Sequence, residues 1–170
     1  MKRIACSVLV LAGLAIGSAE ASAPVVKVDW SDPSTFPGIK QDTCRSVVKP
    51  EEWLGELAEH LQRRAAKLLD DGQTLEVTFT DVRRAGQCEP WRGAGFDNVR
   101  VIKETYPSPQ IDLHYVLRGA DGTVIREGDG KLRDPAFMQH GTPDSSDPLR
   151  YEKRLLDDWL RKQFPRSDGK

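Results

Sequence analysis

Two aspartates of this sequence stand where a carboxylate can do acid–base chemistry. Asp81 follows an apolar, strand-like run, and we expect it on the apolar face of that strand. A carboxylate at a buried edge can have a raised pKa and act as a general base. Asp81 can instead accept hydrogen bonds from the next loop or pair with Arg83 or Arg84, and we favour this structural role. Asp134, which precedes Pro135, is interpreted first as a turn-forming residue and second as a catalytic acid.

A third candidate is a group of polar residues on one strand face. Asp112 and His114 are two positions apart, and Glu127 can face them across a hairpin. An Asp–His–Glu group can bind a metal or move a proton. The sequence offers no further ligand, however, and the open face of an antiparallel sheet is polar in any case. We therefore favour a solvated face, and predict neither a metal site nor a cofactor.

Arginines and aromatic residues gather in the turn-rich segment 83–97. Guanidinium groups bind anionic groups through forked hydrogen bonds, and aromatic rings stack on cations and flat faces. The segment therefore predicts a binding loop for an anionic or sugar-like ligand, or for an envelope protein. The alternative is that the rings fold into a small core and the arginines pair with local acids. The candidate ligand-binding residues are Arg83, Arg84, Trp91, Arg92 and Phe96.

The cysteines predict one disulfide. Cys6 lies in the N-terminal apolar segment, which leaves Cys44 and Cys88 as an even pair. Two remaining cysteines in an exported chain are most simply a disulfide. A redox-active or metal-binding pair is disfavoured, because there is no Cys-x-x-Cys and no histidine at ligand spacing.

The first 21 residues are typical of a secretory signal peptide. Lys2 and Arg3 precede the apolar run 4–16, and Ala19 and Ala21 supply the small residues that a signal peptidase reads. The run is shorter than the ~20 residues of a spanning helix. We therefore expect cleavage after Ala21, a periplasmic or secreted protein, and no membrane span after the signal is removed.

Composition indicates one globular domain. The chain has 170 residues, of which 38% are hydrophobic, and its 25 Lys and Arg nearly balance 26 Asp and Glu. These values exclude a disordered chain and argue against a nucleic-acid binder that relies on bulk charge. We divide the sequence into a signal peptide (1–21), a single α+β domain (22–164) and a frayed tail (165–170).

The candidate residues depend on strands and helices that the hydrophobic pattern predicts. A helix is expected between Pro50 and Gly72, a second between Asp147 and Pro165, and a long loop between them at 128–147. Asp121-Gly122 predicts a hairpin turn. The fold class is α+β: a mostly antiparallel sheet of about five strands with two helices packed on one face. The expected strands are residues 25–30, 74–82, 98–104, 110–118 and 123–127.

Several short motifs occur in a fixed order along the chain. They are Thr80-Asp81-Val82, Ala85-Gly86, Tyr106-Pro107, Ile111-Asp112-Leu113, Asp121-Gly122, Leu132-Arg133-Asp134 and Tyr151-Glu152-Lys153 with Leu156 and Trp159. This ordered set resembles an exported proteobacterial family of uncharacterised function, domain of unknown function 3016. The resemblance implies an exported α+β domain and carries over no activity and no catalytic residue. Arg84 and the cysteine pair depart from the family pattern.

These observations favour a non-catalytic binding or interaction module of the cell envelope, whose contact surface is the 83–97 loop or the open sheet face. One alternative is a small periplasmic hydrolase or transferase that uses Asp81, Asp134 or the Asp112/His114 pair. The other alternative is a purely structural envelope protein.

Overall fold

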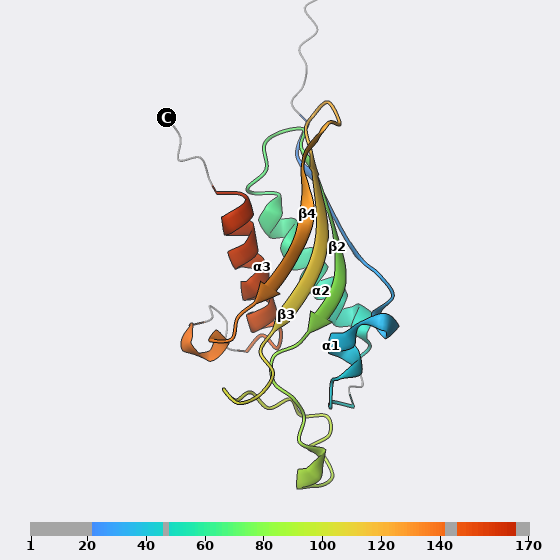
Figure 1. Ribbon diagram of the computed structural model, residues 1–170, viewed down its shortest axis with the longest axis vertical. Helices are drawn as coiled ribbons and strands as arrows, with labels where there is room; N and C mark the ends of the chain where they lie inside the picture. Colours follow the sequence, from blue (N-terminus) through green and yellow to red (C-terminus); the bar gives the residue numbers. More distant parts are fainter. Residues whose placement is uncertain (1–21, 46–47, 142–145, 166–170) are drawn as a thin grey trace, which may run out of the picture.

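A four-stranded sheet forms the centre of the molecule (Figure 1). The computed structural model describes residues 22–45, 48–141 and 146–165. The strand order is β1-β2-β3-β4, with β1 parallel to β2 and the other two pairs antiparallel. The sheet is therefore mostly antiparallel, as predicted, but it has four strands. The strands are β1 (Val25–Trp30), β2 (Thr74–Arg83), β3 (Gln110–Arg118) and β4 (Val124–Arg133).

Two long helices cover one face of this sheet, and a short third helix lies beside the end of β2 (Figure 1). The long helices are α2 (Pro50–Ala65) and α3 (Arg150–Gln163), and the short one is α1 (Pro37–Lys40). The predicted number of helices, two, was therefore one too low. The short 3-10 helices are η1 (Pro33–Thr35), η2 (Pro90–Arg92) and η3 (Phe137–Gln139).

The core lies between the sheet and the two long helices. Alternate residues of β2 and β3 point into it, while the intervening residues face the open side. Burying a large apolar side chain contributes about 1.5–3 kcal/mol, so this stripe provides most of the driving force for packing. The buried residues include Leu75, Val77, Phe79, Ile111, Leu113, Leu54, Leu57, Leu61, Leu156 and Leu160.

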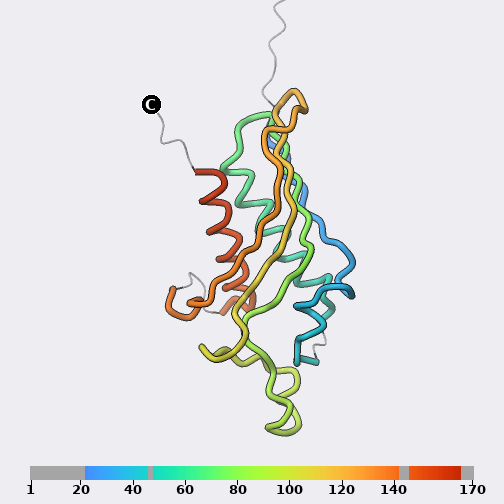
Figure 2. The backbone as a smooth tube through the Cα atoms, in the orientation of Figure 1, coloured from blue at the N-terminus to red at the C-terminus, as the bar shows by residue number. Residues whose placement is uncertain are grey.

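The prediction of a strand at 98–104 is wrong. This segment runs beyond the end of the sheet (Figure 2), and its only ladder contact among the described residues is a bridge between Gln87 and Val101. The side chains of Arg100 and Lys103 instead reach Asp42 and Glu89. Val101 and Ile102 are partly buried there, Val99 is exposed, and none of them extends a sheet edge beyond that bridge.

Strand β4 is longer than predicted and reaches Arg133. Residues 128–133 were expected in a loop, but Gly128 and Gly130 pair with Tyr115 and Leu113 of β3. A Cβ atom at Gly130 would lie 3.0 Å from the Leu113 side chain, so the missing side chain leaves room for the neighbouring strand's residue.

The signal peptide and most of the tail lie outside the described residues. The predictions for 1–21, including cleavage after Ala21, therefore stay predictions, and of residues 165–170 only Pro165 is described.

Candidate functional site

The segment between β2 and β3, which we call the 84–109 loop, projects beyond the end of the sheet (Figures 1 and 2). A disulfide joins Cys88 in this loop to Cys44, which follows α1, with 4.8 Å between the two Cα atoms. Close by, the amide of Arg45 donates to the carbonyl of Asp97 at 2.7 Å. The predicted disulfide is confirmed, and it ties the loop to a second segment of the chain.

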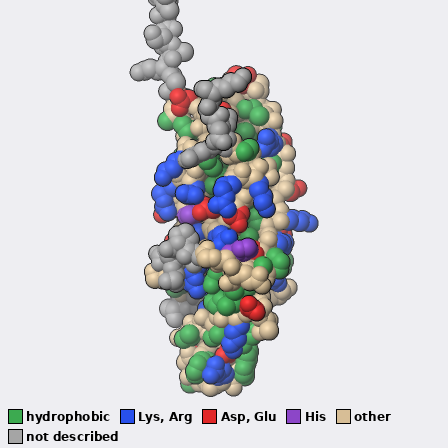
Figure 3. Space-filling view, turned by 90° about the vertical axis from the view of Figure 1, so that its left-hand side faces the viewer, with side chains coloured by type: hydrophobic (Ala, Val, Ile, Leu, Met, Phe, Trp, Pro, Cys, Tyr) green, Lys and Arg blue, Asp and Glu red, His purple; other side chains and the backbone are tan. Residues whose placement is uncertain are grey.

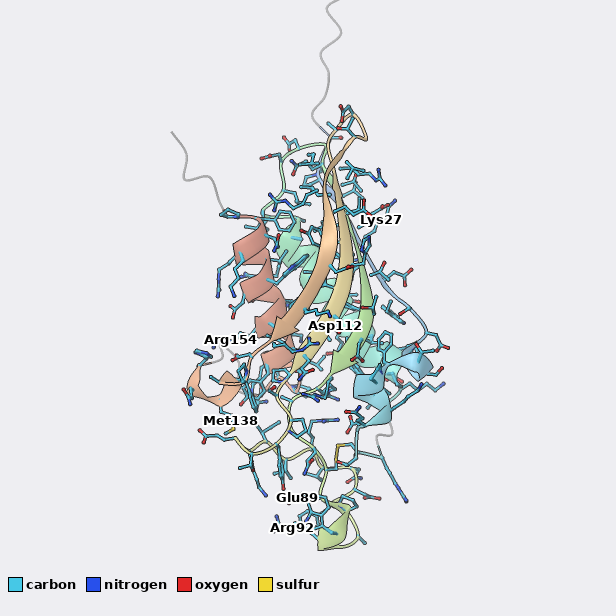
Figure 4. The ribbon with its side chains drawn as sticks, in the orientation of Figure 1. Lys27, Glu89, Arg92, Asp112, Met138 and Arg154 are labelled. Atoms are coloured by element: carbon cyan, nitrogen blue, oxygen red, sulfur yellow. A yellow bond between two sulfur atoms is a disulfide. The ribbon has the colours of Figure 1, made fainter. Side chains whose placement is uncertain are left out.

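A buried carboxylate organises the interior of the loop. Glu89 is 1% exposed, and it accepts hydrogen bonds from Arg92 at 2.8 Å, from Lys103 and from the Tyr106 hydroxyl. These bonds, with that from Arg92 the strongest, lower the pKa of Glu89 to about 2. Glu89 and Arg92 both lie near the far end of the loop (Figure 4). The ionised carboxylate thus holds three side chains of the loop in place.

The outer surface of the loop is aromatic and basic. Trp91, in η2, is 64% exposed, and Phe96 and Val99 are also exposed. The guanidinium carbon of Arg92 lies 4.9 Å from the centre of the Phe96 ring. We call Trp91, Arg92, Phe96 and Val99 the tip. The two rings do not fold inward as a core of their own, so the tip presents a flat indole beside a stacked cation.

The structure places the other two predicted binding residues elsewhere. Arg84 packs against α2, with its guanidinium carbon 5.7 Å from the centre of the Trp53 ring, and donates to the carbonyl of Pro148 at 3.3 Å. Burial lowers the pKa of Arg84. Arg83 belongs to β2 and pairs with Gln110. Three of the five candidates, Trp91, Arg92 and Phe96, therefore lie in the tip. The other two, Arg83 and Arg84, lie at the base of the loop, where it leaves β2.

A second buried carboxylate anchors the base of the loop. Glu152 of α3 is 1% exposed, and its Oε1 accepts a hydrogen bond from the amide of Ala85 at 2.6 Å. Its Oε2 has no hydrogen-bond partner among the described residues. Burial raises the pKa of Glu152, and the nearby Arg84 and Arg100 oppose that effect. Two motifs of the family resemblance, Ala85-Gly86 and Tyr151-Glu152-Lys153, therefore meet in space.

Sequence reasoning missed Glu152, although its position carried a signal. It stands three and four residues before Leu155 and Leu156, both of which are buried. Residues at these separations share one helix face, so a glutamate there enters the core. Glu89 was missed because nothing in its neighbourhood has a regular period.

A β-bulge moves Asp81 to the face opposite the one predicted. The register shifts between Phe79 and Asp81, so that Asp81 pairs with Asp112 and Val82 takes the buried position. The Asp81 Oδ1 accepts a hydrogen bond from the amide of Gly38 at 2.9 Å. The carboxylate therefore fastens α1 to the sheet. Its partner precedes it in the chain and is neither the following loop nor Arg83 or Arg84, the partners expected from the sequence.

The polar residues of the open sheet face pair with one another. His114 Nδ1 lies 2.9 Å from Asp129 and its Nε2 lies 3.5 Å from Glu127, and all three side chains are at least 42% exposed. Asp112 pairs with Arg133 at 2.6 Å. Among the described residues, no group of three or more His, Cys, Asp or Glu side chains is arranged to hold a metal ion.

Asp134 forms a turn, as the structural interpretation proposed. Its Oδ1 accepts a hydrogen bond from the amide of Ala136 at 3.1 Å, and His140 lies 3.8 Å from the same atom. Within the described part of the chain, no hydrogen bond joins any two of Asp81, Asp112, His114 and Asp134.

The fold and these contacts define an α+β domain with a tethered loop that exposes an aromatic, basic tip. Residues 24–162 match the model of the family described as protein of unknown function (DUF3016), and the chain belongs to this family. No curated protein matches the chain. In the described ranges, no helix is both long and apolar enough to cross a membrane.

Proposed function

We propose that the protein is a non-catalytic binding module of the cell envelope whose tip binds an acidic, sugar-like ligand. The observation that carries this proposal is the 64% exposure of Trp91 next to the stacked Arg92 and Phe96. A large aromatic ring in water loses favourable burial, which a ligand with a flat apolar face restores.

The chemistry of the tip favours a ring that carries an anionic group. A pyranose face can stack on the indole of Trp91, and a carboxylate or sulfate on the same ligand can accept hydrogen bonds from Arg92. One nitrogen of Arg92 is already bonded to Glu89, but its side chain is 53% exposed and keeps further donors free to face solvent.

Rigidity of the tip supports binding. The Cys44–Cys88 disulfide and the bonds around Glu89 fix the backbone from which Trp91 and Arg92 project. A surface that is ordered before binding loses less conformational entropy when the ligand arrives.

An envelope location is part of the proposal. A disulfide forms and persists in an oxidising compartment, and residues 1–21 have the layout of a signal peptide. The non-catalytic role is supported by the contacts of the candidate acids: Asp81, Asp134 and His114 each bond to a different partner. A catalytic site needs titratable groups that converge on one point.

The proposal is tested by titrating the protein with oligogalacturonates and with neutral oligosaccharides of equal length, followed by calorimetry. We expect binding of the acidic series only. Trp91→Ala should weaken it roughly tenfold or more, because one stacked ring contributes on the order of 1–3 kcal/mol. The melting temperature of Trp91→Ala should equal that of the wild type, since the Trp91 side chain is exposed.

Met138→Ala is the matched control. Met138 is an exposed apolar residue of η3, away from the tip (Figure 4), and its loss should leave the affinity unaltered. Equal affinities of the wild-type protein and Trp91→Ala would contradict the proposal.

A further inference from the structure

A groove runs between α2 and α3, on the outer side of the two helices. It consists of two adjoining hollows of about 520 Å³ and 430 Å³, which share Asp157 and Arg161. Its charged walls come from both helices, from the turn after α2 and from the turn before α3. They are His60, Arg63, Arg64, Lys67, Asp147, Arg150, Lys153, Arg154, Asp157, Asp158 and Arg161.

The groove concentrates positive charge in a chain that is otherwise slightly acidic. Seven Lys or Arg side chains line it against three Asp, whereas the whole chain has a net charge of −1. Lys and Arg side chains gather across the middle of this face in the space-filling view (Figure 3). A hollow with charge of one sign attracts ligands of the opposite sign.

Carboxylates pair with some of the groove cations but do not neutralise all of them. Lys153 pairs with Asp147 at 2.6 Å, and Arg63 lies 3.6 Å from Glu59, which is outside the groove lining. Two other carboxylates are each shared by two basic side chains. Asp157 lies 3.0 Å from His60 Nε2 and 2.9 Å from Arg64 Nε. Burial raises the pKa of Asp157, but the bonds from His60 and Arg64 outweigh it and the net shift is downward. The Asp157 carboxylate therefore stays ionised and positions the guanidinium group of Arg64.

The same sharing occurs one residue further along α3. Asp158 pairs with both Arg154 and Arg161. Lys67 and Arg150 form no ion pair with a carboxylate of the described residues. The excess charge is thus distributed along the groove, so a ligand with one charge would reach only part of it.

We propose that the α2–α3 groove binds a ligand that carries several linked phosphate groups. Phosphate has up to two charges at neutral pH and accepts forked hydrogen bonds from arginine. The cations come from α2, from the turn that follows it and from α3. The hollow that contains Lys67 also has an apolar part formed by Leu68, Leu160 and Phe164. A free polyphosphate and a lipid headgroup that carries two linked phosphates share this chemistry.

The test measures binding of the full chain to inorganic tripolyphosphate by calorimetry, and to vesicles of cardiolipin in phosphatidylcholine by sedimentation, because each cardiolipin headgroup carries two linked phosphates. Binding of tripolyphosphate alone assigns a soluble ligand, and binding of the vesicles assigns a lipid headgroup. In either case affinity should fall as salt is raised, because the side chains face solvent. Binding of neither probe at low salt overturns the proposal.

A charge-matched pair of variants locates the site. Arg63→Gln/Lys67→Gln/Arg161→Gln removes three groove cations, of which Arg63 and Arg161 are at least 64% exposed, and should weaken binding roughly tenfold or more. Lys27→Gln/Lys40→Gln/Arg118→Gln removes the same charge from residues that do not line the groove, and should change affinity less than about twofold. Equal losses in the two variants would show that only net charge matters. Trp91→Ala should bind tripolyphosphate normally, which separates this test from that of the tip.

Discussion

Two buried glutamates show how surroundings decide the state of one kind of side chain. Glu89 accepts bonds from Arg92, Lys103 and Tyr106, and its pKa falls to about 2. Glu152 accepts one amide bond, from Ala85, and burial raises its pKa. Both carboxylates hold the 84–109 loop, one at the tip and one at the base. Only the second makes the folded state prefer the protonated form.

Replacement of Glu152 should therefore change how stability depends on pH. The pKa of Glu152 in the folded protein lies above the ordinary value of 4.5. Its contribution is complete below that value and is lost as the pH rises through the raised pKa. Glu152→Gln keeps an acceptor for the Ala85 amide but cannot ionise. As the pH rises from 4.5 to 7.5, we expect the melting temperature of Glu152→Gln to fall less than that of the wild type.

Thermal denaturation across that pH range checks this prediction. Glu104→Gln is the control. It removes the same charge as Glu152→Gln, but Glu104 is an exposed residue of the 84–109 loop. If Glu152→Gln and the wild type lost the same amount of stability over the range, burial of the ionised carboxylate would not be the cause.

At the scale of the elements, regular patterns were predictable and local contacts were not. The apolar stripe of α2 and the alternation of β2 and β3 follow from residue spacing alone. The bulge at Phe79/Asp81 left no sequence signal, and it sends Asp81 to the opposite face. Segment 98–104 looked like a strand because of its valines, but its cations bond to Asp42 and Glu89.

Two glycines in different helices should respond to alanine with opposite signs. A Cβ atom at Gly38 would lie 2.5 Å from the carbonyl oxygen of Val82 and 2.8 Å from the Cβ of Arg83. Gly38→Ala should push α1 off β2 and lower the free energy of unfolding by about 1–3 kcal/mol. Gly55, within α2, has no such neighbour within 4 Å, so Gly55→Ala should raise it by about 0.5–1 kcal/mol.

Urea denaturation of the two variants measures both changes. A neutral or stabilising Gly38→Ala would mean that α1 is not packed as closely on β2 as the Asp81–Gly38 hydrogen bond indicates.

For the molecule as a whole, the α+β fold class was predictable, but the second surface was not. The tip could be proposed because Trp91, Arg92 and Phe96 are close in sequence. The α2–α3 groove combines Arg63 and Lys67 with Arg161, nearly a hundred residues away. Each helix alone shows only an ordinary solvated face, and the excess charge appears when the two faces are placed side by side.

The disulfide links these scales, because it joins two segments separated by 44 residues. Closing a loop of this length stabilises the folded state by about 4 kcal/mol in the chain-entropy model. At roughly 3 °C per kcal/mol for a domain of this size, reduction should lower the melting temperature by about 12 °C. It should also weaken binding at the tip, since Cys88 directly precedes Glu89 in the chain.

Differential scanning fluorimetry with and without a phosphine reductant measures the shift. Cys44→Ser/Cys88→Ser is the control, and it should melt near the temperature of the reduced wild type and not respond to the reductant. Because the groove is formed by α2, α3 and the turns next to them, and not by the 84–109 loop, tripolyphosphate binding should survive reduction while tip binding weakens. Equal losses at both sites would instead show that the disulfide supports the whole domain and not the loop in particular.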